Sequence, residues 1–147
     1  MIRFRPATRA DVPAIMALLT DDVLGRGREG ADPAPYLAAF DAMQAEGGNM
    51  LVVGEREGRV VATYQLTVIS GLSLSAARRA QIESVRVDAA LRGTGAGAAL
   101  MADAEARARD AGARLMQLTS NATREDAHRF YERLGYLPSH IGFKKPL

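Results

Sequence analysis

Strands of this chain are predicted by β-branched runs and by alternation of apolar and polar side chains. Ile2 and Phe4 alternate with arginines until Pro6 ends the pattern. Two β-branched runs flank the polar segment 56–59, which is typical of an antiparallel hairpin. The predicted strands cover residues 2–5, 50–55, 60–69, 79–87, 114–120 and 136–144.

Helices are predicted where apolar residues recur every three or four positions. Thr8 and Asp11 form a capping box that opens the first helix. The other helices are expected at 36–47, 95–111 and 124–134. The order of elements places antiparallel hairpins early and one strand–helix–strand crossover over 80–120, so we expect an α/β (α+β) fold with a mixed sheet.

The segment 79–87, RAQIESVRV, presents mixed chemistry on both of its faces. Strict alternation puts Ile82, Ser84 and Arg86 on one side. It puts Glu83 on the other side, together with Val85 and Val87. Neither face is simply core, so this strand is a candidate for the functional site.

Composition narrows the class of protein. Apolar residues make up 48% of the 147 residues and charged residues 24%, as in ordinary globular proteins. The net charge is only +2 and arginines are scattered among acids, which argues against a nucleic-acid partner. The absence of cysteine excludes disulfides, thiolate metal sites and a cysteine nucleophile. The N-terminus lacks the apolar stretch of a signal peptide and no run reaches membrane-spanning length, so we expect a cytoplasmic protein without a membrane partner.

A glycine-rich loop, RGTGAG at 92–97, lies between a predicted strand and a predicted helix. The start of a helix attracts anions, and Arg92 adds a guanidinium group that can donate two parallel hydrogen bonds to an oxyanion. The plain alternative is a flexible turn, because R-x-x-G-x-G is expected by chance ~0.15 times in a chain of this composition. A Walker A loop is excluded because no Lys-Ser/Thr follows the glycines. The Ala-ending dinucleotide fingerprint matches at Gly93, but no acidic residue ends a second strand about 20 positions later.

This loop, after IESVRV and before a long helix, resembles the R/Q-x-x-G-x-G/A signature of the GNAT family of N-acetyltransferases. Residues 121–136, NATREDAHRFYERLGY, resemble the second block of that family. The resemblance implies a single acetyltransferase domain over 1–147. It implies a mixed, mostly antiparallel twisted sheet of about six strands flanked by about four helices. Acetyl-CoA would lie where the two central parallel strands splay apart.

The resemblance also implies which residues contact acetyl-CoA. Val85 and Val87 would offer backbone groups to the pantetheine arm, although both also suit plain core packing. Asn121 would contact pantetheine or position water, or would simply cap a helix. The full implied set is Val85, Arg86, Val87, Arg92, Gly93, Thr94, Gly95, Ala96, Gly97, Asn121 and His128.

Acetyl transfer to an amine needs a base and an acid. An unperturbed alkyl amine titrates near ~10.4, so a carboxylate must take its proton, provided that burial raises the basicity of that carboxylate. Glu83 is the candidate base, and a surface glutamate is its alternative. The leaving thiol titrates near ~8.5, so a proton donor beside sulfur assists its departure. Tyr131 coincides with the family's general acid, and a half-buried core tyrosine is its alternative.

The acceptor is the least determined part. The C-terminal stretch from Thr119 is similar to small-molecule branches of the family, including aminoalkylphosphonate N-acetyltransferases. We therefore expect a small-molecule amine, with a peptide or protein amine and a non-catalytic acetyl-CoA sensor as alternatives. The residues of segments 70–77 and 24–35 would determine which of these acceptors the protein binds.

Two unplaced histidines make a poor case for a metal site, and we expect none. A homodimer through 136–143 is compatible with the sequence. Basic residues that form either an anion site or an exposed rim are Arg78, Arg79, His128, His140, Lys144 and Lys145.

Overall fold

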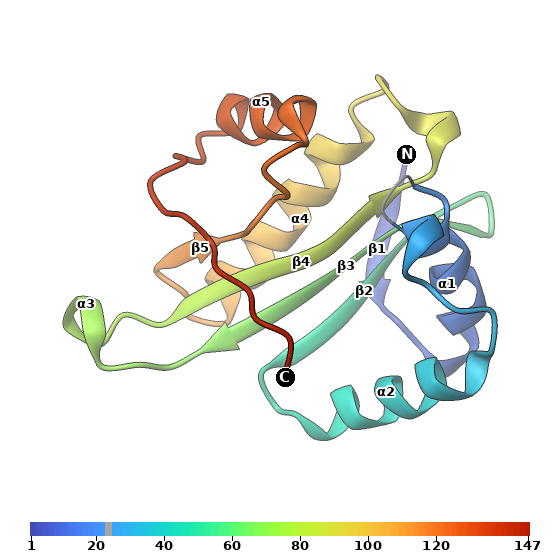
Figure 1. Ribbon diagram of the computed structural model, residues 1–147, viewed down its shortest axis with the longest axis horizontal. Coiled ribbons are helices and arrows are strands. Elements are labelled where there is room, and N and C mark those ends of the chain that lie inside the picture. Colours follow the sequence, from blue (N-terminus) through green and yellow to red (C-terminus); the bar gives the residue numbers. More distant parts are fainter. Residues whose placement is uncertain (23–24) are drawn as a thin grey trace.

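A five-stranded sheet forms the centre of the molecule, with helices on both of its faces (Figure 1). The computed structural model describes residues 1–22 and 25–147. The strand order is β1-β2-β3-β4-β5, with β1 to β4 antiparallel and β5 parallel to β4. The strands are β1 (Arg3–Pro6), β2 (Asn49–Arg56), β3 (Arg59–Ile69), β4 (Arg79–Val87) and β5 (Leu115–Gln117).

The helices divide between the two faces. In Figure 1, α1 and α2 lie on one side of the sheet, while α4 crosses the other side with α5 beside it. Among residues 1–22 and 25–147, no helix combines the length and the apolar character that a bilayer crossing requires. The helices are α1 (Val12–Thr20), α2 (Pro33–Ala45), the short α3 (Ser73–Ala76), α4 (Ala96–Asp110) and α5 (Glu125–Arg133).

Each face of the sheet buries its own apolar cluster. Between the sheet and α4, Leu66, Ile82 and Leu100 are buried almost completely. Between the sheet and the first two helices, Ile15 and Phe40 are likewise buried, together with Val53. Burial of a large aliphatic or aromatic side chain contributes about 1.5–3 kcal/mol, so these two clusters fix the layers.

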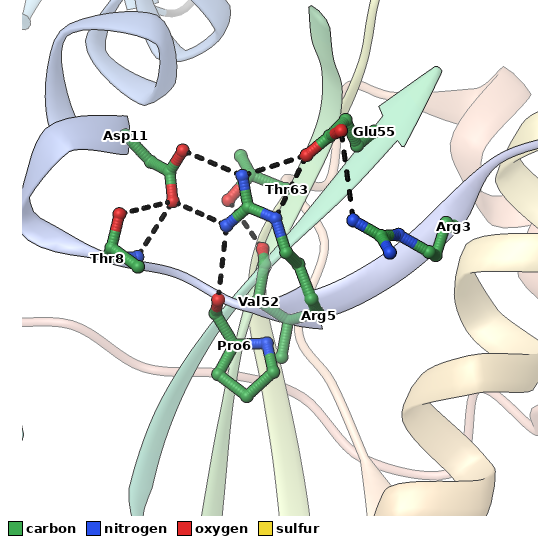
Figure 2. A network of polar contacts seen from close by, with 8 residues as sticks. All are labelled: Arg3, Arg5, Pro6, Thr8, Asp11, Val52, Glu55 and Thr63. Atoms are coloured by element: carbon green, nitrogen blue, oxygen red, sulfur yellow. Dashed lines mark hydrogen bonds and ion pairs between the residues drawn. The ribbon is translucent and has the colours of Figure 1, made fainter. Parts of the chain in front are cut away.

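A polar network joins β1 to the start of α1, as Figure 2 shows. The guanidinium of Arg5 lies between two carboxylates, 2.7 Å from Asp11 and 3.0 Å from Glu55. Asp11 Oδ2 also accepts hydrogen bonds from the backbone N–H and the hydroxyl of Thr8, so the predicted capping box is confirmed. The hydrogen bond from Arg5, helped by those from Thr8, lowers the pKa of Asp11 to about 2.

A second network ties α4 to the sheet. The hydroxyl of Tyr64, on β3, donates to Asp103 at 2.5 Å. Arg107 donates to the same carboxylate at 2.8 Å and to the carbonyl of Phe4, on β1, at 3.3 Å. Burial and the adjacent Asp103 raise the pKa of Tyr64 far above its ordinary value, so the hydroxyl remains a donor.

The structure differs from the sequence prediction at the C-terminal end of the chain. The described residues hold five strands and five helices, where about six strands and about four helices were expected. The strand predicted over 136–144 is wrong, because this segment joins no strand ladder. Pro138 lacks an N–H group, and β5, at the edge of the sheet, is only three residues long. Exposed apolar side chains of the segment are Leu137, Ile141 and Phe143.

Candidate active site

The strands β4 and β5 separate after a short stretch of pairing. Only Arg79–Gln81 pairs with Leu115–Gln117, although the sequence predicted a strand over 114–120. Past Gln81, the edge of β4 that faces β5 has no partner strand among the described residues. Its main-chain N–H and C=O groups therefore need another partner, either solvent or a ligand with amide groups.

The glycine loop ends at this gap and begins α4. Gly95 is the N-cap with φ of 85°, a conformation that side chains other than glycine rarely adopt. The first intrahelical hydrogen bond runs from Ala99 N to the Gly95 carbonyl, so the N–H groups of 96–98 have no acceptor within the helix. Arg92 and Thr94 are exposed beside them. The loop and the first turn of α4 therefore combine backbone N–H donors that lack acceptors with the cationic side chain of Arg92.

Gly97 has a packing role that the loop prediction did not include. A Cβ atom at this position would lie 3.2 Å from Cζ of Phe130, on α5. Glycine thus allows α5 to approach the first turn of α4 closely. Tyr131, the next residue on α5, packs against the apolar cluster beneath α4.

Tyr131 lies half-buried between aromatic rings. Its ring centroid is 5.2 Å from that of Phe130 and 6.1 Å from that of Tyr136. Burial raises the pKa of Tyr131, which keeps its hydroxyl protonated at neutral pH. That hydroxyl has no hydrogen-bond partner among residues 1–22 and 25–147, whereas the Tyr136 hydroxyl donates to Glu105 at 3.0 Å. Of the two hydroxyls, that of Tyr131 is the one able to serve a ligand.

A bulge in β4 changes the face of Glu83. Thr63 pairs with Arg86 and Gln65 pairs with Glu83, so one residue of β3 faces two of β4, and Ser84 adopts φ of 53°. Glu83 and Arg86 therefore share the face covered by α1 and α2, while Val85 and Val87 join the cluster beneath α4. The prediction that Glu83 points to the same side as the two valines is wrong. Glu83 is also exposed, so burial around it would have to come from bound substrates.

The segment after β5 is held by its own hydrogen bonds. Asn121 Oδ1 accepts from the backbone N–H and the hydroxyl of Thr123, which closes a turn two residues before α5; the N-cap of the helix is Arg124, without a side-chain cap hydrogen bond. His128 Nε2 lies 2.8 Å from the carbonyl oxygen of Asn121, and this contact stabilises the same turn. The hydroxyl of Ser120, one residue earlier, is buried without a partner among the described residues. Sequence reasoning missed Ser120, although its position next to Asn121 was a usable signal.

A half-buried ion pair was also missed. Arg86 Nε lies 2.7 Å from Asp22 Oδ2, with side-chain exposures of 11% and 21%, at an angle that does not make a hydrogen bond. Burial lowers the pKa of Arg86 despite the neighbouring carboxylate. Burial acts to raise the pKa of Asp22, but the Gly25 N–H and the charges of Arg86, Arg124 and Arg28 together hold it below its ordinary value. No local pattern predicts this pair, because Asp22 and Arg86 are far apart in sequence.

The basic residues considered for an anion site come from different segments, with Arg78 and Arg79 at the start of β4, His128 on α5, and His140, Lys144 and Lys145 after α5. His128 is engaged with Asn121, and His140 lies exposed beside Ser139 at 2.7 Å. Lys144 and Lys145 are exposed in the C-terminal segment. The charges of Arg28, Arg86 and Arg124 instead act together on Asp22. Leu24, which begins one of the segments expected to decide the acceptor, lies outside the described residues.

Comparison with known proteins identifies the family. The acetyltransferase (GNAT) family matches residues 13–136 of this chain. The chain belongs to the GNAT family. The α/β fold expected from the sequence, with its mostly antiparallel sheet and one parallel strand pair, is confirmed for this GNAT chain.

Individual relatives agree with this membership. The GNAT chain is 48% identical over 67 residues to an aminoalkylphosphonate N-acetyltransferase from Salmonella typhimurium, and this match spans 46% of the chain and 44% of that protein. A crystal structure of a transcriptional regulator from Bacillus halodurans C-125 is 38% identical, with a TM-score of 0.95 over 100% of both chains. An acetyltransferase from Trypanosoma brucei, 24% identical with a TM-score of 0.82 over 100% of both chains, shares the fold.

Proposed function

We propose that this GNAT protein transfers the acetyl group of acetyl-CoA to the primary amine of a small molecule. The observation that carries the proposal is the gap between β4 and β5. The gap joins an unpaired strand edge, a helix start rich in free N–H groups and the unpartnered hydroxyl of Tyr131. Acetyl-CoA has a thioester at one end, two amide groups along its pantetheine arm and a pyrophosphate beyond them, which suit the Tyr131 hydroxyl, the strand edge and the helix start respectively.

The residues present fit acetyl-CoA. The buried hydroxyl of Ser120 lacks a partner, and the N–H groups of 96–98 lack intrahelical acceptors. Main-chain groups of Val85 and Val87 would hold the pantetheine arm, with Asn121 opposite them. Arg92, with the loop 93–97, would hold the pyrophosphate through charge and backbone donors. When bound, acetyl-CoA supplies the acetyl group as an activated thioester.

Two side chains would move protons. Glu83 Oε would take a proton from the acceptor ammonium, directly or through water, so that the amine nitrogen can bond to the acetyl carbon. Tyr131 Oη would give its proton to the departing sulfur as the C–S bond breaks, which yields an amide and a free thiol. The nitrogen bonded to the acetyl carbon loses its second proton to solvent as the amide forms. The tyrosine regains a proton from solvent, and the glutamic acid releases one, so that one proton leaves in each cycle. Charge and atoms balance over one cycle.

The acceptor class rests on similarity to a named relative. The Salmonella relative is named for a small phosphonate amine, and its match covers less than half of either chain. The Bacillus neighbour is described as a transcriptional regulator, so a non-catalytic acetyl-CoA sensor is the second candidate. Retention of both Glu83 and Tyr131 favours catalysis over sensing.

Release of free thiol from acetyl-CoA, measured across a panel of amines, tests the proposal. We expect amine-dependent release with small primary amines and only background release with peptides that carry a free N-terminus or lysine. Binding of acetyl-CoA without amine-dependent release from any member of the panel would favour the sensor. Faster release with peptides than with small amines would move the acceptor class to proteins.

A further inference from the structure

The chain exposes more surface than a compact monomer of its mass. A folded monomer of 15.7 kDa exposes about 7,300 Å² of solvent-accessible surface, whereas this chain exposes 9580 Å². The difference of about 2,300 Å² is larger than the roughly 800 Å² that each partner of a stable protein complex buries. A single copy therefore leaves enough surface uncovered to form an interface of ordinary size.

The segment 137–147, here called the C-terminal arm, consists entirely of exposed residues. Leu137, Ile141 and Phe143 are 82%, 81% and 91% exposed. They occupy alternate positions of the arm, with polar or small residues between them. Such alternation is typical of a strand that buries one face against a sheet. Within one chain the arm joins no ladder with the described strands, so its apolar face lies in solvent.

The arm leaves the body of the protein from a fixed point. Tyr136, which precedes it, donates its hydroxyl to Glu105 at 3.0 Å and its N–H to the Tyr131 carbonyl at 3.1 Å. The arm touches its own chain at Gly142, where a Cβ would lie 3.7 Å from Cγ2 of Thr119, but this contact covers none of the apolar side chains. Extended residues rise about 3.3 Å each, so the arm can reach roughly 36 Å from its anchor.

The outer edge of β5 is the complementary feature. β5 is the last strand of the sheet and pairs with β4 alone, so its other side has no strand partner in the part of the chain that the structure describes. Leu115, on this strand, is 40% exposed. An open edge with an apolar side chain favours addition of another strand. The opposite edge, β1, carries two arginines and ends in Pro6, which are features that oppose strand addition.

Further exposed apolar side chains lie at the same end of the sheet. Leu72 and Leu74 are in the β3–β4 connection, which contains α3, and both are exposed. The N–H of Arg114 donates to the carbonyl of Arg78 at 2.8 Å, so this connection adjoins the start of β5, as Figure 1 also shows. Apart from Met1, the exposed large apolar residues among 1–22 and 25–147 all belong to this connection, β5 and the arm.

We propose that two copies of this chain form a symmetric dimer in which the arm of each copy pairs as a strand with the outer edge of β5 in the other. Each chain supplies both an arm without a partner strand and an edge without a partner strand. The contact is therefore self-complementary and closes after two copies, which favours a second copy over an unrelated protein. Leu137, Ile141 and Phe143 are then covered in the dimer, and Leu115 is covered by the arm of the other copy. The dimer does not depend on the proposed acetyl transfer.

Molecular mass in solution, measured by light scattering over a dilution series, tests the proposal. The wild type should have twice the chain mass of 15.7 kDa. The double variant Ile141→Asp/Phe143→Asp places charge on the apolar face of the arm. It should raise the Kd of the dimer at least roughly 1,000-fold, because each substitution acts twice in a symmetric interface. The control, His140→Asp/Lys144→Asp, changes positions on the other face of the arm and should remain a dimer.

Both double variants should fold. The four side chains that they change are exposed in a single chain, so the circular dichroism spectrum of each variant should match that of the wild type. A change of mass with an unchanged spectrum then reports on association alone.

A single introduced thiol locates the interface, because the chain contains no cysteine of its own. The thiol of Leu115→Cys should react with a maleimide at least roughly tenfold more slowly in the dimer than in combination with Ile141→Asp/Phe143→Asp, since the arm covers it. Ala10→Cys, an exposed position before α1, is the control and should react equally in both backgrounds.

Other results would overturn the inference. A wild type with the mass of one chain at every concentration would do so, and protection of Leu115→Cys in such a monomer would show that the arm folds onto its own β5. A dimer that survives Ile141→Asp/Phe143→Asp would have its interface on another surface. Equal maleimide reactivity of Leu115→Cys in the dimer and in the monomeric variant would likewise exclude pairing at β5. None of these measurements uses acetyl-CoA, so each outcome leaves the proposed acetyl transfer untouched.

Discussion

Arg5 Nη1 donates a hydrogen bond to Asp11 Oδ2 at 2.7 Å, and this contact fixes β1 to the beginning of α1 (Figure 2). Both side chains are partly withdrawn from solvent, with exposures of 29% and 10%. A charge-assisted bond in this setting contributes more than an exposed ion pair. The position of α1, which covers one face of the sheet, depends on it.

The pKa of Asp11, lowered from 3.8 to about 2 chiefly by Arg5, predicts a pH-dependent stability. The carboxylate stabilises the folded state fully above the unfolded pKa, and this contribution is lost as the pH falls through 3.8 toward 2. We expect the loss to be about 2 kcal/mol. Urea unfolding between pH 5 and pH 2 should therefore show a shallower decline for Asp11→Asn than for the wild type.

The control for this prediction is Asp41→Asn. Asp41 pairs with Arg9 at 3.1 Å, but both side chains are more than half exposed. Such pairs contribute about 0.2–1 kcal/mol, so this variant should follow the wild-type pH profile closely. Parallel profiles for Asp11→Asn and the wild type would contradict the role assigned to the Arg5 contact.

Gly97→Val should destabilise the protein because its side chain would enter the space held by Phe130. The built Cβ already lies 3.2 Å from Cζ of the phenylalanine ring. Overpacking of this kind costs about 1–3 kcal/mol. Ala98→Val, at the next and exposed position, should cost only the helix propensity of valine, less than about 0.7 kcal/mol. Thermal unfolding of both variants, without ligand, measures the difference, and equal costs would refute the proposed contact.

Local signals predicted most of the fold. The Thr8–Asp11 capping box, the hairpin around 56–59 and the long helix after the glycine loop depend on residues close in sequence, and each is confirmed. The final strand was wrong because a strand needs a partner, and alternation over 136–144 gives no information about whether a free sheet edge is available.

The site was less predictable for the same reason. The bulge at Ser84 depends on pairing with β3, so strict alternation assigned Glu83 to the wrong face. The Arg86–Asp22 pair joins segments that only the folded chain brings together. The glycine loop and Tyr131 could be proposed as site residues from the sequence because each lies within a short motif, whereas the arginines that act on Asp22 belong to no motif.

Arg92→Gln should weaken binding of acetyl-CoA specifically through its pyrophosphate. We expect the Kd for acetyl-CoA to rise roughly tenfold, the usual effect of losing a hydrogen bond to a charged group. The Kd for acetyl-pantetheine, which lacks the pyrophosphate, should not change. Arg109→Gln, near the opposite end of α4, is the control and should bind both compounds normally. Calorimetric titration of the wild type and both variants with each ligand measures these Kd values, and equal weakening of both ligands by Arg92→Gln would assign the arginine elsewhere.

Tyr131→Phe should lower kcat by one to three orders of magnitude, about the range for loss of general acid assistance. Tyr136→Phe is a close control because it removes the same atom from a neighbouring ring whose hydroxyl is engaged with Glu105. Its kcat should stay within about threefold of the wild type. Thiol release at saturating acetyl-CoA and acceptor is the measurement. Equal turnover of the two variants would leave Tyr131 as a packing residue.

Glu83→Gln should lower activity at neutral pH and recover part of it in alkaline solution. An amine that titrates near ~10.4 is almost entirely protonated at pH 7, so the wild type needs a base, whereas at high pH the free amine is supplied by solvent. Loss of a positioned base costs about 10²- to 10⁴-fold. Glu57→Gln, at the exposed hairpin turn, is the control and should keep the wild-type profile. The pH dependence of kcat/KM for the acceptor, from pH 6 to 10, distinguishes the outcomes. If Glu83→Gln only scales the wild-type profile by a constant factor, the proton leaves by another route. A base on the α1 and α2 face would then have to be sought among the other carboxylates near Arg86.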